Sequence, residues 1–240
     1  MGRGMEKTAW TLPNGEVVLF PRGLRQETAL ELVEPGESLL DVGCGRGAVA
    51  AILATRFRSV HGIDSDEEAL ADAQSRGVVT HRLDLDSEPL PFDAGSFDAA
   101  LCLEVIEHVL DPPQLIREVA RVLRPGGHVY VSTPNIRFLG YLRTLVFGGR
   151  FPDTSADPAA FRGGHVHFFT FRDVEDLLAA EGFEAVRHHG LSAGRARVAG
   201  RLLPGGLSRE LLSVGAFSVA RRAEGSVPAV GRRPRERRSA

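Results

Sequence analysis

The stretch Leu39-Leu40-Asp41-Val42-Gly43-Cys44-Gly45-Arg46-Gly47-Ala48 begins as an apolar strand and ends in a glycine-rich turn. Apolar residues 49–53 follow at once and begin a helix. Open α/β sheets build nucleotide pockets in this order, because glycine lets a ligand approach the backbone and the helix N-terminus offers free N–H groups. The stretch therefore predicts a nucleotide-binding α/β domain.

The turn fits two classes of cofactor. Gly43-x-Gly45-x-x-Ala48 satisfies the dinucleotide fingerprint, and Asp64 lies about 20 residues further on, where a ribose-binding acid is expected. Asp41, however, lies at the turn, where a carboxylate would repel a pyrophosphate and attract an ammonium group. This charge favours S-adenosylmethionine (SAM), with an NAD-dependent enzyme as the alternative.

Composition indicates an ordinary globular protein in a reducing compartment. The chain has 240 residues, 43% hydrophobic and 25% charged, and a net charge of -2. This balance does not favour nucleic-acid binding. Cys44 and Cys102 are the two cysteines, one in the glycine turn and one in an expected core strand, so we expect no disulfide and a cytoplasmic location. We expect no signal peptide and no membrane span. The sequence does not indicate which oligomeric state the protein adopts.

Apolar runs and helical periodicities alternate along the chain. Strands are expected at 39–42, 60–63, 78–85, 97–103, 128–132, 183–186 and 213–219, and helices at 26–33, 48–57, 67–74, 113–123 and from the Thr170-Phe171-Arg172-Asp173 capping box to Gly182. An Asn-Gly turn predicts a small hairpin within residues 11–19. The alternation predicts a doubly wound, mostly parallel α/β sheet with helices on both faces.

The predicted domain organisation is simple. Residues 1–220 form a single domain, in which the aromatic, glycine-rich and irregular segment 136–162 belongs to an acceptor-covering or lid insertion at about 136–170. Residues 221–240 carry seven arginines and two glutamates among Gly, Pro and Ser, which predicts a disordered basic tail.

Acidic residues follow two of the predicted strands. Asp64 ends the second strand, where it could accept both ribose hydroxyls; it or Ser65 could instead cap the next helix. Asp84 follows the third strand and could accept from the adenine amino group, with Asp86 as the competing assignment. Both acids are expected above the carboxyl ends of the strands, where such folds bind ligands.

Six motifs occur in a characteristic order: Asp41-Val-Gly43-Cys-Gly45-Arg-Gly47, Asp64, Leu90-Pro91-Phe92, Ser96-Phe97-Asp98, Glu104-Val-Ile-Glu107-His108 and Leu123-Arg-Pro125-Gly126-Gly127. In this order the chain resembles class I SAM-dependent methyltransferases of the ubiquinone-biosynthesis O-methyltransferase type, over about residues 26–190. The resemblance implies a Rossmann-like seven-stranded sheet whose last strand is antiparallel. It also implies SAM binding, and our candidate set is Asp41, Gly43, Cys44, Gly45, Asp64, Ser65, Asp84 and Leu85.

Glu104, Glu107 and His108 follow the fourth strand, where this fold places substrate. On a helical turn their spacing would put all three on one face. His108 could act as general base, the three could bind a divalent metal together with His165 or His167, or they could only orient the loop. Some related methyltransferases use a Glu-x-x-Glu-His motif for metal. We favour a metal-free base and name His108, Glu107 and His165 as the catalytic candidates.

The histidines of Gly163-Gly164-His165-Val166-His167 would share one face of a strand and could belong to the acceptor site. The sequence as a whole predicts methyl transfer from SAM to a small-molecule acceptor, at a hydroxyl oxygen. The alternatives are an RNA 2′-O-methyltransferase with a Glu/His metal site and an inactive SAM-binding module.

Overall fold

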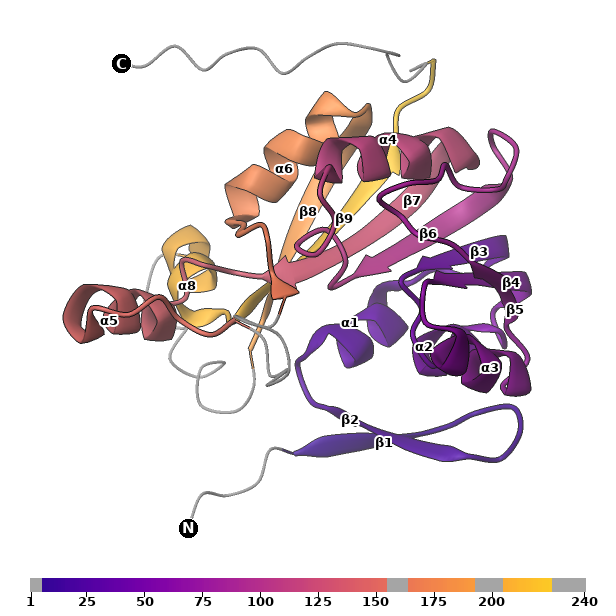
Figure 1. Cartoon of the computed structure of the whole chain (residues 1–240), viewed down its shortest axis with the longest axis horizontal. Coiled ribbons are helices and arrows are strands. Elements are labelled where there is room, and N and C mark those ends of the chain that lie inside the picture. Colours follow the sequence, from indigo (N-terminus) through magenta and orange to yellow (C-terminus); the bar gives the residue numbers. More distant parts are fainter. Residues whose placement is uncertain (1–5, 155–163, 193–204, 226–240) are drawn as a thin grey trace.

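Seven strands form one mixed sheet in the computed structural model, which describes residues 6–154, 164–192 and 205–225 (Figure 1). The strands are β3 (Gly36–Val42), β4 (Phe57–Asp64), β5 (Val79–Arg82), β6 (Phe97–Leu103), β7 (Leu123–Pro134), β8 (Phe183–Leu191) and β9 (Gly215–Arg222). Their order is β5-β4-β3-β6-β7-β9-β8, and β9 is antiparallel to both of its neighbours. The predicted doubly wound, mostly parallel seven-stranded sheet is confirmed.

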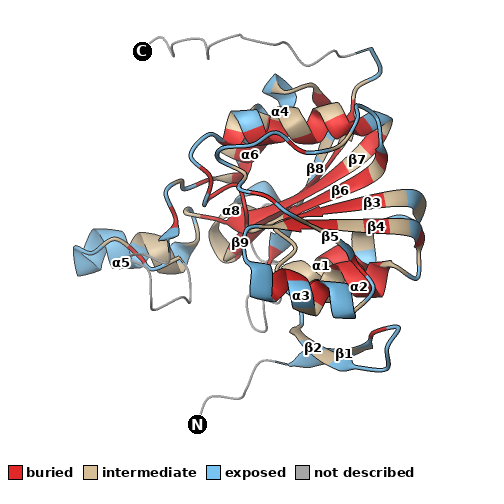
Figure 2. Ribbon diagram, turned by 45° about the vertical axis from the view of Figure 1, so that its right-hand side comes forward, coloured by how far each residue is buried: buried red, intermediate tan, exposed pale blue. Residues whose placement is uncertain are grey.

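Helices cover both faces of this sheet. The described helices are α1 (Arg25–Leu32), α2 (Ala48–Leu53), α3 (Glu67–Ser75), α4 (Pro112–Val122), α5 (Leu139–Gly148), α6 (Phe171–Ala180) and α8 (Gly205–Leu212). Of these, α5 projects away from the sheet and buries no residue (Figure 1). Side chains alternate along β3, so that Leu39 packs with α1, α2 and α3, whereas Leu40 and Val42 pack with α4 and α6. Figure 2 shows the buried strands between these two helical layers.

The expected hairpin precedes the sheet. Its strands β1 (Lys7–Thr11) and β2 (Val17–Pro21) pair antiparallel around the Asn14-Gly15 turn, and Gly15 has a φ of +86°. Arg76, the residue that follows α3, forms an ion pair with Glu16 at 2.7 Å, which ties the hairpin tip to the domain.

Several element boundaries differ from expectation. The helix expected to reach residue 57 ends at Leu53, because Phe57 begins β4 and pairs with Gly36 of β3. The strand expected at 78–85 is limited to Val79–Arg82. The capping box of α6 is confirmed, because the Thr170 hydroxyl accepts from Asp173 N and the Asp173 carboxylate accepts from Thr170 N.

The segment expected to be irregular contains α5, a ten-residue helix, and α8 was not predicted. The last strand ends at Arg222, two residues beyond the expected domain limit at 220, and residues 226–240 of the expected tail lie outside the described residues. Both cysteines are free, as predicted. Within the described ranges, no helix is long and apolar enough to cross a membrane.

Candidate functional site

A cleft of about 300 Å³ opens where β3, β4, β5 and β6 end at the same edge of the sheet. It is lined by Gly43, Asp64, Ser65, Leu83, Asp84, Leu85, Asp86, Glu104, Val105, His108 and Val109. Five of the predicted SAM-binding residues therefore share one cleft with two of the predicted acceptor-site residues. Parallel strands bring these distant segments together, as ligand sites of open α/β sheets require.

The glycine turn supplies the backbone geometry of the cleft. Gly43, Gly45 and Gly47 all have positive φ angles, of +69°, +50° and +70°. A side chain at Gly47 would collide with Ala73 of α3 at 2.6 Å, whereas one at Gly45 would meet no atom within 4 Å. Gly47 thus permits close packing of α2 and α3, while Gly45 leaves open space for a ligand beside the backbone.

Two acids lie beneath and beside this turn. Asp41 is buried, and burial together with the Asp64 carboxylate raises the pKa of Asp41 to about 7. Asp64 Oδ2 accepts from Gly45 N at 2.8 Å, and its Oδ1 accepts from Asp66 N at 3.0 Å. Asp66, and neither Asp64 nor Ser65, caps α3 by accepting from Glu68 N and Ala69 N. Each oxygen of Asp64 keeps a further lone pair, which a ribose hydroxyl can use.

Cys44 and Gly45 belong to the turn without lining the cleft. The Cys44 thiol packs beneath the turn near Gly62 of β4, and Cys44 N donates to Ile63 O at 2.9 Å. Burial strongly raises the pKa of the Cys44 thiol, so this group is an uncharged packing element.

The loop after β5 distinguishes its two acids. Leu110 N donates to Asp86 Oδ1 at 2.7 Å, so Asp86 ties this loop to the loop after β6. Asp84 is exposed in the cleft, and its Oδ1 accepts from Asp86 N at 3.0 Å. Asp84 is therefore the acid better placed for an adenine amino group.

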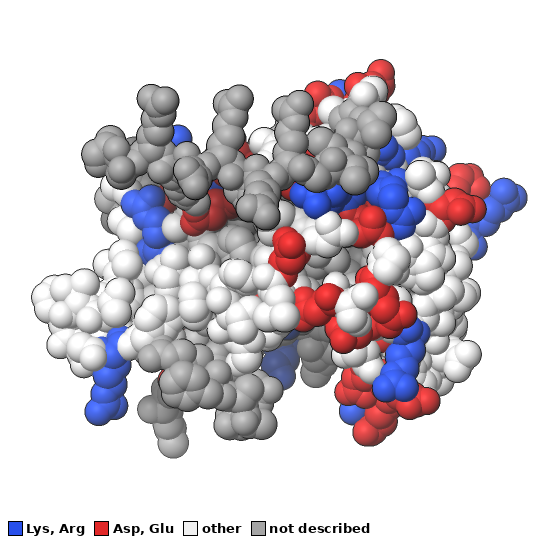
Figure 3. Space-filling view, turned by 45° about the horizontal axis from the view of Figure 1, so that its top comes forward, with Lys and Arg blue, Asp and Glu red and all other residues white. Residues whose placement is uncertain are grey.

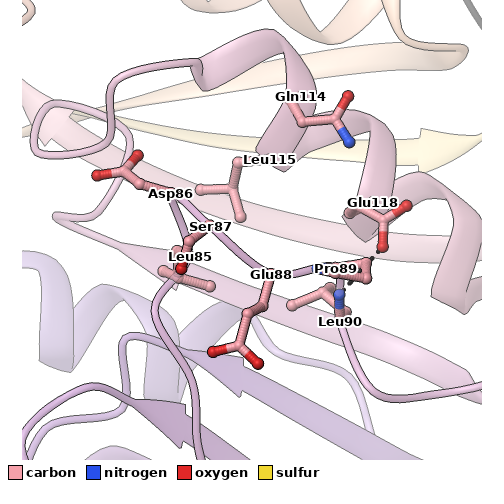
Figure 4. A pocket seen from close by; sticks show the side chains of 9 residues that line it. All are labelled: Leu85, Asp86, Ser87, Glu88, Pro89, Leu90, Gln114, Leu115 and Glu118. Carbon is pink, nitrogen blue, oxygen red and sulfur yellow. Dashed lines mark hydrogen bonds between the residues drawn. The ribbon is translucent and has the colours of Figure 1, made fainter.

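A second hollow, of about 190 Å³, lies behind the same loop on the α4 side (Figure 4). Leu90 N donates to Glu118 Oε2 of α4 at 3.1 Å, as the dashed line shows. Leu115 projects from α4 toward the loop. The hollow thus lies behind the loop after β5, and the hydrogen bond to Glu118 shows how α4 supports that loop.

Glu104 has an unusual backbone for a non-glycine residue, with a φ of +59°. Its Oε1 accepts from the Ser132 hydroxyl at 3.0 Å, and its Oε2 lies 3.8 Å from Arg25 Nη1. Burial raises the pKa of Glu104, while Arg25, Ser132 and His108 oppose that rise. Such a strained position at the end of a strand is typical of functional sites.

Glu107, His108 and His165 form the second part of the site, which we call the Glu-His cluster. One ligand atom from each of the three lies within 4.8 Å of the other two. The rings of His108 and His165 meet edge to face, with centroids 4.6 Å apart. Glu107 O accepts from Val166 N and His167 N at 2.9 and 3.1 Å, which holds the His165 loop against the loop after β6.

The cluster differs from the predicted arrangement. Residues 104–108 form no helix, so Glu104 faces Arg25 and Ser132 while Glu107 and His108 meet His165. The His165 loop is not a strand, and His167 turns away, with Nε2 3.3 Å from Leu110 O. His165, the first of the two candidate histidines, is the one that joins the cluster.

The electrostatics of the cluster follow from burial. Glu107 is 1% exposed, and among the described residues neither of its carboxyl oxygens has a partner with full hydrogen-bond geometry, although the Thr133 hydroxyl lies near enough to favour the charged form. Burial, with the Glu104 carboxylate, raises the pKa of Glu107 to about 8. Burial, with His108, lowers the pKa of His165 to about 4, so that this imidazole is neutral at pH 7. An unpaired buried carboxyl beside a neutral imidazole is a donor set that fits a cation.

Three supporting residues had no signal in the sequence. Arg25 reaches Glu104 from α1, the Ser132 hydroxyl reaches it from β7, and Thr154 Oγ1 lies 2.7 Å from His165 Nδ1. Each of the three residues reaches the site from a segment distant in the sequence, so no local spacing indicates its role.

Comparison with known proteins agrees with this geometry. A family model described as a methyltransferase domain matches residues 19–188. A protein named ubiquinone biosynthesis O-methyltransferase from Coxiella burnetii (strain Dugway 5J108-111) is 35% identical over 147 residues, covering 57% of this chain and 62% of that protein. A protein of the same name from Pseudomonas paraeruginosa (strain DSM 24068 / PA7) is 39% identical over 116 residues, 46% of this chain and 50% of that protein. The chain thus spans less than two thirds of the length of these curated relatives.

A solved structure supports the fold assignment. The SAM-dependent methyltransferase from Mesorhizobium loti superposes with a TM-score of 0.59 and is 25% identical, covering 82% of this chain and 98% of that one. The Rossmann-like sheet is therefore shared with known methyltransferases.

Proposed function

The chain belongs to the methyltransferase domain family, and on this premise we propose that it transfers a methyl group from SAM to a hydroxyl oxygen of a small molecule, releasing S-adenosylhomocysteine (SAH). One observation carries the proposal: the cleft at the carboxyl edge joins the SAM candidates Gly43, Asp64 and Asp84 to Glu104 and His108. The names of the curated relatives support an oxygen acceptor.

SAM would lie across the ends of the strands. Asp64 accepts the ribose hydroxyls, while Asp84 and the backbone at Leu85 contact the adenine. The open space beside Gly45 receives the methionine part, whose ammonium group is attracted by the buried Asp41. The sulfonium methyl then points toward the Glu104 and His108 end of the cleft.

Methyl transfer itself needs placement more than acid-base chemistry. An acceptor oxygen lone pair forms the new C–O bond while the C–S bond breaks and its electrons return to sulfur. The hydroxyl proton must leave, and His108 lines the cleft and can take it. The main contributions of the chain are the in-line position of the two substrates and the exclusion of water.

A divalent cation is the second candidate for activating the acceptor. The unpaired oxygens of Glu107, with His108 and His165, are the residues that would hold it. When bound, such an ion lowers the pKa of a coordinated hydroxyl by acting as a Lewis acid. His108 has a role in both the metal-free and the metal-assisted mechanism, so a substitution of His108 alone does not distinguish them.

A small-molecule acceptor is better supported than RNA. On the face that Figure 3 shows, the Lys and Arg side chains of the described residues are interspersed with Asp and Glu and form no basic stripe of the kind that binds a phosphate backbone. Burial raises the pKa of the Tyr141 phenol on α5, and the nearby Glu104 carboxylate adds to that rise, so α5 approaches the Glu104 end of the cleft, where we place the acceptor. The apolar α5 suits an acceptor with an apolar part, and the two free cysteines fit the cytoplasm as its place of action.

Thermal unfolding with candidate cofactors tests the proposal. SAM and SAH should raise the melting temperature, because they bind the folded state, and NAD and NADP should leave it unchanged. Mass spectrometry of hydroxyl-bearing compounds incubated with SAM should then show a methylated product. Stabilisation by NAD alone would refute the methyltransferase assignment, and SAM binding without any product would indicate the inactive module.

Chelation separates the base from the metal. If a cation is used, EDTA should abolish turnover and Mg²⁺ or Mn²⁺ should restore it, with SAM binding retained. If His108 acts alone, EDTA has no effect and His108→Ala slows transfer by roughly 10²–10⁴-fold. His167→Ala is the matched control, because His167 faces Leu110 O outside the cluster.

A further inference from the structure

His165 joins the Glu-His cluster with one ring nitrogen already engaged. Thr154 Oγ1 lies 2.7 Å from His165 Nδ1, which leaves Nε2 as the nitrogen available to a proton or a ligand. A neutral imidazole carries one N–H and one lone pair, and the partner of one nitrogen decides which atom carries each. Thr154 is therefore placed to decide which tautomer His165 adopts.

We propose that Thr154 is a positioning residue whose hydroxyl accepts the Nδ1–H of His165 and so directs the Nε2 lone pair to the acceptor site. The proposal rests on the proposed function, and it holds whether a proton or a cation meets that lone pair. It assigns a role to a residue that lies outside every motif in the sequence and outside the cleft lining.

The surroundings of His165 leave this task to a side chain. Backbone bonds from Val166 N and His167 N to Glu107 O fix the path of the loop, and His165 is 9% exposed. Backbone bonds do not choose a tautomer, and the ring torsion of a histidine has a broad energy minimum. Among the described residues, the Thr154 hydroxyl forms a hydrogen bond with the His165 ring, so it fixes both the tautomer and the ring torsion.

The direction of this hydrogen bond decides what the cluster can do. A threonine hydroxyl can donate as well as accept. If it donated to Nδ1, then Nε2 would carry the proton and the cluster would present an N–H group. Such a ring could neither take a proton from an acceptor nor bind a cation. The position of one ring proton therefore distinguishes the two arrangements.

Nitrogen-15 NMR of the 240-residue chain, labelled at histidine, locates that proton. Correlations between ring nitrogens and ring C–H protons identify the tautomer, and His165→Gln assigns the His165 signals by their disappearance. The wild type should show the Nδ1–H form. Thr154→Val, which keeps the shape and removes the hydroxyl, should lose that preference, whereas Thr154→Ser should keep it.

Kinetics provide the second readout. Thr154→Val should lower kcat by roughly 10–100-fold, the usual effect of removing such a supporting hydrogen bond, with the KM for SAM unchanged. Thr154→Ser should restore most of kcat. An Nε2–H tautomer in the wild type would overturn the proposal, as would an unchanged tautomer and kcat in Thr154→Val. If wild-type protein binds no SAM, the proposed function fails, and the NMR result still decides the role of Thr154.

Discussion

Asp41 is buried at the end of β3, and its pKa is raised to about 7 by burial and by Asp64. In the SAM-free protein, the folded chain thus holds this proton more tightly than the unfolded chain. The stability contributed by protonated Asp41 is therefore present at acid pH and is lost as pH rises through about 7. A bound ammonium group would offset the loss by attracting the ionised carboxylate.

We therefore expect SAM to raise the melting temperature more at pH 8 than at pH 6. Thermal unfolding at both pH values, with and without saturating SAM, measures this difference. Asp41→Asn is the matched control, because it keeps the shape and cannot ionise, so its SAM shift should depend less on pH. An equal pH dependence in the variant would remove Asp41 from the ammonium site.

Substitutions at Gly45 and Gly47 should separate an effect on ligand binding from an effect on packing, although the two positions are only two residues apart. Gly47→Ala places a Cβ 2.6 Å from Ala73 at a φ of +70°, so overpacking and backbone strain should together cost about 2–4 kcal/mol of stability. Gly45→Ala meets no atom, so it should cost only about 1 kcal/mol of strain. Calorimetric titration with SAM should nevertheless show that Gly45→Ala loses more binding free energy than folding free energy. Equal stability losses in the two variants would contradict this division.

Single residues also show what sequence could and could not predict about the site. Asp64, Asp84 and Gly43 follow strands in a motif order, and parallel strands bring their ends together, so their shared cleft was predictable. Thr154 and Arg25 reach the site through tertiary contacts that leave no spacing in the sequence. The expected helical face of Glu104 and Glu107 failed because Glu104 adopts a positive φ, which its residue type does not indicate.

Among the elements, the ends of α2 and α6 were harder to predict than their starts. The Thr170 and Asp173 pair marks the start of α6 chemically, whereas α2 ends at Leu53 because β4 needs the apolar Phe57. The helix α5 was missed because it contains glycine and buries no residue, so it has neither helix propensity nor a clear apolar face.

The start of α6 gives a direct test of such an element signal. Thr170→Ala removes the hydroxyl that accepts from Asp173 N, so it should cost about 1 kcal/mol, or about 2–4 °C in melting temperature. Thr170→Ser keeps the acceptor and should retain most of that stability. Chemical denaturation of both variants measures the difference, and equal stability of the two would show that the cap contributes nothing.

At the scale of the molecule, charged and uncharged surfaces separate. The α5 side of the face in Figure 3 is largely uncharged, and Phe147 of α5 is 84% exposed. The other half of that face mixes charges of both signs. Tyr141 of α5 lies near Glu104, which lines one end of the cleft, so the proposed function predicts that an acceptor reaching this end passes the uncharged side.

Strand β9 defines the C-terminal limit of the folded domain. Strand β9 lies between β7 and β8, so its last residues pair with both neighbouring strands. Arg221 pairs with His128, Arg222 pairs with Phe183 and donates to Leu123 O, and Ala223 N donates to Gly182 O. Arg222 is only 9% exposed. These contacts place the limit beyond 222.

Two truncations should therefore behave differently. Deleting 226–240 should change stability by no more than about 0.5 kcal/mol, the usual limit for changes away from structural contacts, and should leave SAM affinity unchanged. Deleting 221–240 removes the Arg222 hydrogen bond and the ends of both ladders, and should cost at least about 3 kcal/mol. Thermal unfolding of both forms measures the difference. A large loss in the shorter deletion would mean that the arginine-rich segment docks on the domain, because only contacts formed by its residues could then explain the lost stability.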